Sequence, residues 1–419
     1  MNDQGYGDFQ SPEGGYGGSQ KPGPSYAGRG AKSGKAGATQ VVVEPFPSDA
    51  VPFLGPATEF DPTMRAALPG IVKGKVPAGK SAELNENAGA VVDLTDDTGG
   101  GMPPYFGLND EEMLYPGSLV KIGAMYAAFE LRSRVERQVR ATMNAGTINI
   151  QKPGGWTNLV NKVIADIEAA WGPKLAADFP DKPKDGFPQL RTILGFRSDG
   201  DVIFSPGSVT DPDGGFDDWL SNMVIHSRKD AAGRVIRALG FPYINGVLAG
   251  AGFFERSSSS GIWLSGDFEG RDWQTNNRAG QKLTKRWARA QRRTQSNFTA
   301  TAYSVAALLT ALARGQLVDK QSSAKMLRLM DGGTVSFVKD ALREAEPIRD
   351  FDEVLFKIGI GEPPLDGRRH DCAIVKRTLP SKKEIRYVVV GFSFKLERPP
   401  EALKRLFRNL DDVVAKRHA

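Results

Sequence analysis

Near its C-terminus the chain changes from a helical to a β hydrophobic pattern, and this change most restricts the folds that it can adopt. Three β-rich runs occupy residues 354–361, 370–378 and 385–394. The turn-like segments EPPLDGRR and LPSKKE join them. Connections this short favour antiparallel pairing, because parallel neighbours need a long crossover. The sequence therefore predicts an antiparallel meander at this end of the chain.

A helix is predicted after the meander, because Pro399 and Pro400 precede a segment with a helical apolar period. Its apolar face comprises Leu403, Leu406, Phe407, Leu410, Val413 and Val414. Toward the other end of the chain, AGAVVDL (residues 88–94) has the composition of a strand and precedes the turn signal DDTGG. A second extended stretch follows it. This N-terminal strand pair is expected to join the sheet of the meander.

The region between the two groups of strands is predicted to be mostly helical. Its helical segments are residues 116–135, 158–172, 216–227, 229–240, 298–315 and 319–330. Strands from both chain ends predict a mixed α/β (α+β) fold, in which an antiparallel sheet of about five strands has helices on both faces beside a mostly helical subdomain. A Rossmann pattern is excluded, because it needs strands that alternate with helices throughout.

The chain divides into a tail and one globular domain. Residues 1–85 are predicted to be a disordered, low-complexity tail and linker, because residues 1–40 contain few aliphatic side chains and residues 41–85 are interrupted by proline. Residues 86–419 form the predicted domain, with an insertion at about 144–215 that is rich in Gly, Pro and Asp. The evenly spaced tyrosines of the tail leave self-association open beside a plain solvated tail.

Composition excludes several classes of protein. The single cysteine, Cys372, excludes an intrachain disulfide, and three histidines leave little for a zinc site. No metal and no other cofactor is therefore predicted. No run approaches the roughly 18 consecutive apolar residues of a membrane span, and no apolar core of a secretory signal is visible at the N-terminus. The net charge of +6 indicates no particular partner, and the compartment stays open.

One pair of residues has the spacing that nucleophilic catalysis needs. Ser118 and Lys121 stand three apart at the start of a predicted helix, so their side chains share a face. A serine becomes nucleophilic when a neighbour accepts its proton, and a lysine that is held neutral by burial or nearby positive charge can do so. The same spacing occurs at Ser322 and Ser336, each followed by a lysine, so a solvated helix face remains the alternative.

These residues have a context that resembles the penicillin-recognising serine hydrolases, the class A β-lactamases and related DD-peptidases. The resemblance runs from about residue 88 to 394. The segment YPGSLVKIGAMYAAFELR resembles the nucleophile helix of that family, and MVIHSRKDAAGRVIRALG resembles its Ser-Asp-Asn segment, with Ser227 at the serine. The segment FTATAYSVAALLTALARGQLVD resembles the long helix after the omega loop. Finally, LFKIGIGEPPLDGRR resembles the Lys-Thr-Gly strand, with Lys357 and Gly359 on the motif.

The resemblance implies a role for each matched residue. Ser118 would form the acyl-enzyme, and Lys121 would accept its proton. Ser227 would pass a proton to the leaving nitrogen, beside the positive charge of Lys357. The remaining matched positions are the backbone N–H groups of Ser118 and Ile360, which would form the oxyanion hole, and the substrate-binding positions Lys229 and Gly359. The implied partner is a small molecule or peptide that donates an acyl group, and no cofactor is needed.

Departures from the family motifs argue against efficient β-lactamase activity. Ser-Asp-Asn has become Ser227-Arg228-Lys229, and Lys-Thr-Gly contains Ile358 in place of the threonine. No Glu-x-x-Leu-Asn follows Ser227, and the nearest acids, Glu255 and Glu269, lack that pattern. Two hypotheses remain: a serine acyl hydrolase with a changed substrate, and a catalytically degenerate relative that binds or scaffolds.

A basic segment, residues 271–293, occupies the position of the family's omega loop. It contains eight basic residues and one acid, interleaved with Trp273 and Trp287. Such a segment can contact phosphates or an anionic glycan, or it can be the solvated flank of a helix. Two further residues are predicted to have no catalytic role. His226 is expected to be a packed or capping residue, and Cys372 a small buried side chain in a strand.

Overall fold

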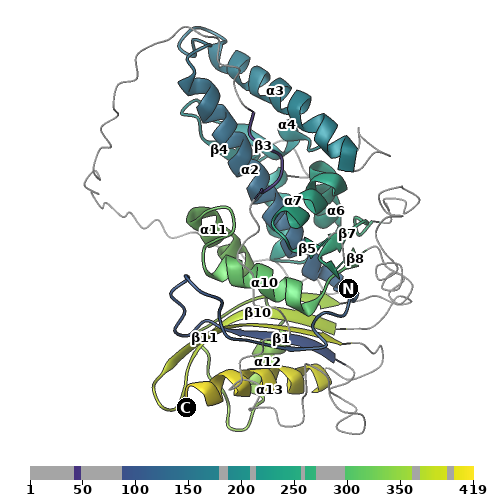
Figure 1. Cartoon of the computed structure of the whole chain (residues 1–419), viewed down its shortest axis with the longest axis vertical. Coiled ribbons are helices and arrows are strands. Elements are labelled where there is room, and N and C mark those ends of the chain that lie inside the picture. The colour runs from purple at the N-terminus through teal and green to yellow at the C-terminus, as the bar shows by residue number, and fades with distance from the viewer. Residues whose placement is uncertain are drawn as a thin grey trace, which may run out of the picture. The chain divides into compact units, whose positions relative to one another are not determined.

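The computed structural model describes residues 42–48, 87–178, 187–207, 214–255, 260–269, 298–360, 369–393 and 401–419. Its largest sheet has five antiparallel strands in the order β2-β1-β11-β10-β9 (Figure 1). They are β1 (Asn87–Asp93), β2 (Tyr105–Leu108), β9 (Glu353–Ile360), β10 (Arg369–Thr378) and β11 (Glu384–Ser393). Strands from both chain ends thus form one sheet, and the predicted fold class is confirmed.

Both faces of this sheet are buried. Along β1, Ala90 and Val92 belong to one apolar cluster and Val91 to another, as expected when successive side chains of a strand point to opposite faces. In β11, Val390 and Val389 alternate in the same way. The sheet therefore separates two cores, and its strands are buried at most positions rather than at every second one.

Helices cover the two faces. The face that carries Val91 and Val389 packs against α12 (Phe337–Arg343) and α13 (Glu401–Arg417). The face that carries Ala90 and Val390 packs against α10 (Ala302–Ala313) (Figure 1). The predicted apolar face of α13 is buried in full. The N-cap of α10 is Thr301, whose hydroxyl accepts a hydrogen bond from the backbone N–H of Ser304 (3.0 Å). The helix therefore begins after the predicted start at residue 298, because Phe298 and Thr299 form strand β8.

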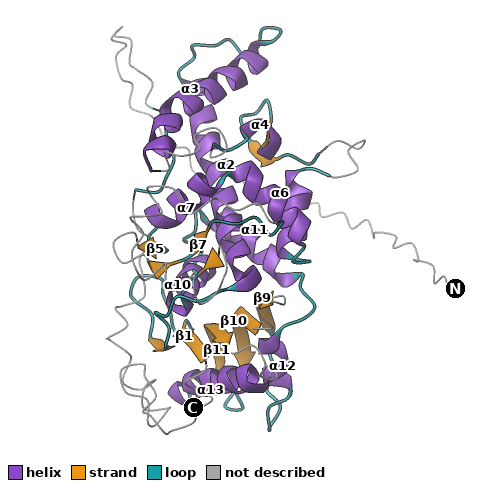
Figure 2. Cartoon of the chain, turned by 90° about the vertical axis from the view of Figure 1, so that its right-hand side faces the viewer, coloured by secondary structure: helices purple, strands orange, loops and turns teal. Residues whose placement is uncertain are grey.

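A mostly helical region follows β2 and continues to β8 (Figure 2). Its helices are η2 (Gly117–Leu119), α2 (Val120–Asn144), α3 (Gly155–Asp178), α4 (Leu190–Ile193), α5 (Phe216–Val224), α6 (Lys229–Leu239) and α7 (Phe241–Gly250), and α11 (Lys320–Asp331) packs beside them. Its short strand pairs are β3–β4 (Leu194–Phe196, Val202–Phe204), β5–β6 (Phe254–Glu255, Ser260–Gly261) and β7–β8 (Trp263–Leu264, Phe298–Thr299).

Some of these elements were not predicted. The insertion holds α3, which extends past the expected helix at both ends, and also α4 and the β3–β4 hairpin. Helix α7 was missed because Pro242, Gly246 and Gly250 lower its helix propensity. It forms because it is buried along most of its length, so tertiary packing outweighs local preference.

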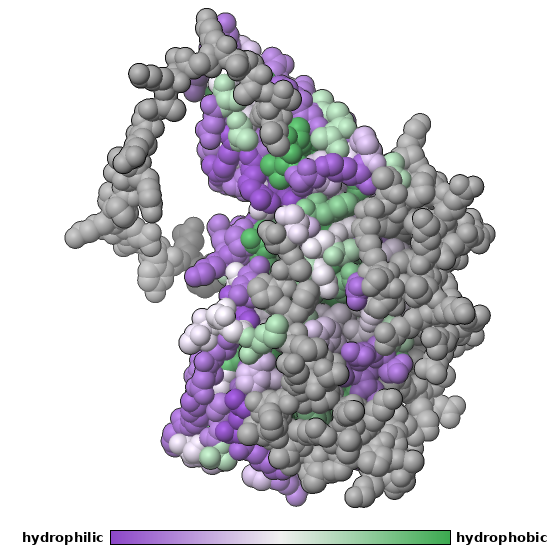
Figure 3. All heavy atoms as spheres, in the orientation of Figure 1, coloured by the Kyte–Doolittle hydropathy of each residue, from purple (hydrophilic) through white to green (hydrophobic). Residues whose placement is uncertain are grey.

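Hydrophilic side chains cover most of the described surface around α2 and α3, with smaller hydrophobic areas between them (Figure 3). Of the helices within the described ranges, none is long and apolar enough to cross a membrane. The described residues also contain no group of three or more His, Cys, Asp or Glu side chains that could hold a metal ion.

Candidate functional site

The edge strand β9 lies in close backbone contact with η2, and two glycines make this contact possible. A Cβ atom on Gly117 would lie 3.1 Å from the backbone nitrogen of Ile360, and one on Gly359 would lie 2.5 Å from the carbonyl oxygen of Pro116. Gly117 also has a φ of +54°, which favours glycine. The same Cβ position on Gly359 is 3.2 Å from the nitrogen of Ser118. The backbone around Ser118 therefore meets the backbone around Ile360 at the open edge of the sheet.

Ser118 and Lys121 lie one helical turn apart at the junction of η2 and α2. The side chain of Ser118 is partly exposed, whereas Lys121 is fully buried. The Nζ atom of Lys121 donates to the carbonyl oxygens of Ser227 (2.6 Å) and Arg228 (3.3 Å) and lies 3.4 Å from Oγ of Ser227. Lys121 thus connects the start of α2 to the loop between α5 and α6.

Ser227 joins two lysines through its side chain. Its hydroxyl accepts a hydrogen bond from Nζ of Lys357 on β9 (2.7 Å) and also faces Lys121. The backbone of Ser227 is held at a φ of +54°, an uncommon conformation for a residue with a side chain. Lys121, Ser227 and Lys357 come from three separate elements, so the structure brings together residues that are 106 and 130 positions apart.

Burial and like charge change the acidity of both lysines. Burial, together with the charges of Lys357 and Lys229, lowers the pKa of Lys121 to about 6, against an opposing contribution from Asp230. Burial also lowers the pKa of Lys357, to about 8. At pH 7 the side chain of Lys121 is therefore mostly neutral and that of Lys357 mostly charged. A neutral amine can accept a proton, and the neighbouring ammonium supplies positive charge.

An aromatic ring covers the amine of Lys121. The ring of Phe268 lies 4.7 Å from its Nζ atom and stacks on Phe298 at 4.3 Å. Phe268 adopts a φ of +67°. Sequence reasoning missed it, because no local pattern marks a ring that meets a side chain 147 positions earlier. Among the described residues, no carboxylate forms an ion pair with Lys121.

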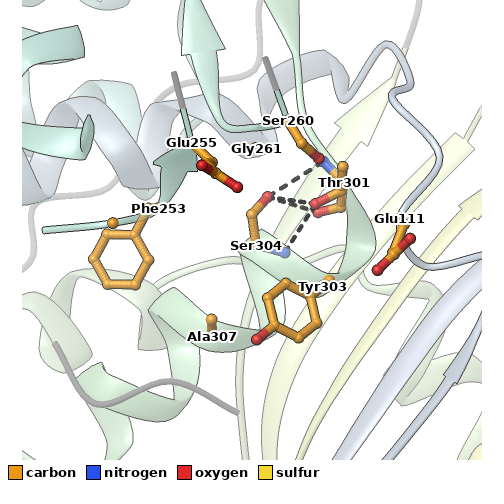
Figure 4. A pocket seen from close by; sticks show the side chains of 10 residues that line it. Glu111, Phe253, Glu255, Ser260, Gly261, Thr301, Tyr303, Ser304 and Ala307 are labelled. Atoms are coloured by element: carbon orange, nitrogen blue, oxygen red, sulfur yellow. Dashed lines mark hydrogen bonds between the residues drawn. The ribbon is translucent and has the colours of Figure 1, made fainter. Parts of the chain in front are cut away.

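The acids considered from the sequence lie elsewhere. Glu269 pairs with Arg237, which also binds Asp267 at 2.7 Å. Glu255 lines a pocket of about 260 Å³ together with Glu111 and Tyr303 at the start of α10 (Figure 4). No residue of the Lys121–Ser227–Lys357 network lines that pocket, so it is not part of the predicted site.

The other residues singled out in the sequence have structural contacts. The hydroxyl of Ser322 accepts from Arg132 (3.0 Å) and that of Ser336 bonds to Asp371 (2.8 Å), so the two further Ser-x-x-Lys pairs do not enter the network. Cys372 is buried, as predicted, and its Sγ atom donates to the carbonyl of Lys357 (3.5 Å). His226 is exposed.

Two regions discussed from the sequence lie outside the described residues. They are the low-complexity tail, residues 1–40, and the basic segment 271–293 with its predicted anionic ligand. Lys229, predicted to contact substrate, is exposed at the first turn of α6.

One family model and several solved structures are similar to this chain. Residues 210–405 match the model of the β-lactamase enzyme family. No curated protein matches the chain. The solved structures similar to it include a mutant class A β-lactamase of the last common ancestor of Gram-negative bacteria, bound to a nitrobenzotriazole transition-state analogue (16% identity, 80% of this chain, 96% of that one, TM-score 0.42). A second is a β-lactamase from Chitinophaga pinensis (16% identity, 80% of this chain, 97% of that one, TM-score 0.42). A third is a mutant of PBP-A as an acyl-enzyme with penicillin G (11% identity, 79% of this chain, 90% of that one, TM-score 0.42).

Proposed function

Because residues 210–405 match the model of the β-lactamase enzyme family, we propose that the chain is a serine hydrolase that forms an acyl-enzyme on Ser118. The observation that carries this proposal is the network in which a buried, largely neutral Lys121 shares the hydroxyl of Ser227 with a charged Lys357. A merely structural lysine at this depth would be expected to pair with a carboxylate, and a binding protein has no need of a neutral amine beside a serine.

In the proposed acylation step, the neutral amine of Lys121 takes the proton of Ser118 as its Oγ atom attacks the carbonyl carbon of an amide or ester. The carbonyl oxygen becomes an oxyanion, which the backbone N–H groups of Ser118 and Ile360 bind. The leaving nitrogen or oxygen receives a proton from the hydroxyl of Ser227. The proton that Lys121 accepted then returns to Ser227 across their 3.4 Å contact.

The charges around this network favour a substrate with an anionic group. Lys357 is inside the network, and Lys229 lies close enough to lower the pKa of Lys121. Ile358 cannot donate the hydrogen bond that the threonine of a Lys-Thr-Gly motif offers to a substrate. Binding of the substrate therefore depends more on the positive charge of the lysines. We therefore propose a small molecule or peptide whose carboxylate lies near Lys357.

The acyl-enzyme is expected to be long-lived. Its hydrolysis needs a base that activates a water, and the described residues place an aromatic ring, Phe268, against Lys121 in place of a carboxylate. The acids nearest in sequence are held by Arg237 or lie at the other pocket. Slow release agrees with a transferase or peptidase-like activity better than with efficient β-lactam hydrolysis.

The test is covalent labelling of the full chain with a fluorescent penicillin and, separately, with an activated ester, followed by intact-mass measurement. We expect one adduct per chain in the wild type and in a Ser381→Ala control, which changes an exposed turn serine. We expect none in Ser118→Ala. If no acyl donor labels the wild type, the chain is instead the degenerate binding or scaffolding relative.

The rate of labelling should have a bell-shaped dependence on pH, with limbs near pH 6 and pH 8. It rises as Lys121 (pKa about 6) loses its proton and falls as Lys357 (pKa about 8) loses its own. Two substitutions of Phe268, whose ring lies against Lys121, test the limb near pH 6. Phe268→Leu keeps the amine dry but removes the attraction of the ring for a cation, so this limb should move to lower pH.

Phe268→Ala should move the same limb to higher pH, because water that enters beside Lys121 relieves the burial that lowers its pKa. Stopped-flow labelling between pH 5 and about 9 measures both shifts. Shifts of the same sign in the two variants, or none, would contradict the assignment of the acidic limb to Lys121.

A further inference from the structure

Residues 42–48, with the sequence VVEPFPS, lie in the helical region beside α2, α3 and α7 (Figure 1, dark purple). We call this segment the strap. It falls inside the predicted linker, but its Pro45 is buried and its Phe46 packs on the main apolar core. The strap has no helix or strand of its own, so its contacts with the three helices hold it in place.

The strap contacts a surface formed by α2, α3 and α7, which we call the groove. Three side chains of α2 and α3 bind the backbone of the strap. Gln138 of α2 accepts from the N–H of Val43 (2.9 Å) through its Oε1 atom, and Trp171 of α3 donates to the carbonyl of the same residue (2.6 Å). Arg134 donates to the carbonyl of Glu44 (2.6 Å). Arg134 is oriented by an ion pair with Glu130 one turn earlier (2.5 Å). The groove therefore binds the backbone of the strap at two consecutive residues.

Two glycines of α7 shape the groove for the side chains of the strap. A Cβ atom on Gly246 would overlap the ring of Phe46, and one on Gly250 would lie 2.5 Å from the carbonyl oxygen of Pro47. The ring of Tyr243 lies 6.2 Å from that of Phe46. The two glycines thus leave a notch in α7 that accepts an aromatic residue flanked by prolines. Replacing Gly246 by any residue with a side chain would fill this notch.

We propose that this groove is a peptide-binding site whose resident ligand is the strap, bound reversibly. Its ligand class is a peptide of the form hydrophobic–Glu–Pro–aromatic–Pro. The polar side chains of the groove support this, because Gln138, Arg134 and Trp171 are buried and direct their hydrogen bonds to the strap. Prolines at both sides of Phe46 restrict the backbone of the free peptide, which lowers the entropy cost of binding.

The site is distinct from the acyl-transfer site. Arg134 is 13 residues beyond Lys121 on α2, which is about 20 Å along a helix. The strap is also part of the same chain, so it competes with a free peptide as an intramolecular ligand. A free peptide should therefore compete poorly with the strap of the wild-type chain and bind well once that strap is weakened.

The test uses a fluorescein-labelled peptide of residues 41–49 and full-length chains, with binding followed by anisotropy. A Phe46→Ser chain, whose own strap lacks the aromatic anchor, should bind the peptide at least ~10-fold more tightly than the wild type does. Adding Gly246→Ala should weaken this binding at least ~10-fold. The matched control adds Gly172→Ala, a helical glycine of α3 with open space around it, and should leave binding unchanged.

Hydrogen exchange of the strap provides a second measurement on the intact chain. The amide of Val43 should be protected in the wild type and in Gly172→Ala, and should exchange at least ~10-fold faster in Gly246→Ala. The proposal is overturned if the Phe46→Ser chain does not bind the peptide. It is equally overturned if Gly246→Ala and Gly172→Ala behave alike in both measurements.

Discussion

A Lys121→Met variant is expected to acylate about 10²–10⁴-fold more slowly than the wild type, because the variant has no base for the proton of Ser118. Methionine is close to lysine in volume, so the core around Lys121 stays filled. Labelling with a fluorescent penicillin or ester measures the loss. Lys339→Met is the matched control, since Lys339 also follows a serine by three residues and lies over an aromatic ring, that of Phe356 (4.6 Å), yet it is not in the network.

The same variant should unfold at an equal or higher temperature at pH 6, although it loses the hydrogen bonds of Lys121. The folded-state pKa of Lys121 is depressed to about 6, so the unfolded chain binds more protons between that pH and about 10.4. The cost of burying this lysine is therefore largest below pH 6 and decreases as pH rises. Thermal unfolding of both chains from pH 6 to 9 should show the advantage of the variant shrinking. An advantage that grows with pH contradicts a neutral buried Lys121.

The second large effect is expected from Gly359→Ala. The new methyl group would meet the carbonyl oxygen of Pro116 at 2.5 Å, and that oxygen belongs to backbone that cannot rotate away. Either β9 or η2 must move, which separates the N–H groups of Ser118 and Ile360. Loss of an oxyanion hole costs about 10²–10³ in rate, and the forced packing about 1–3 kcal/mol of stability.

Labelling kinetics and chemical denaturation measure the two effects of Gly359→Ala. Gly100→Ala, at a glycine with open space around it, is the control and should change neither. A Gly359→Ala chain that labels at the wild-type rate would show that the close approach of β9 and η2 is irrelevant to acylation.

Local patterns predicted the elements whose residues carry their own signals. Thr301 caps α10 because a threonine side chain can accept a backbone N–H, and α13 is buried along the face that its leucines mark. Ser118, Lys121, Ser227 and Lys357 were predicted as site residues because each lies in a short motif. The contacts of Lys121 and Lys357 with Ser227, however, depend on the chain reversals between α5, α6 and β9, which no single motif describes.

The features missed from the sequence depend on contacts between distant segments. Phe268 meets Lys121 through a loop, and Phe46 enters a notch that exists because Gly246 has no side chain. Helix α7 forms against its local propensity because its neighbours bury it. In each case the determining interaction joins residues far apart along the chain, so a window of neighbouring residues contains no trace of it.

The order of strands in the large sheet has a consequence for biosynthesis. Strand β1 lies between β2 and β11 in the sheet, and β11 follows every other described strand along the chain. At the end of α13, Arg417 and His418 both contact Asp93 of β1 (3.0 and 2.7 Å). A nascent chain therefore holds β1 without its β11 neighbour until β11 has been synthesised, and the β9–β10 pair that carries Lys357 is joined to β1 only through β11.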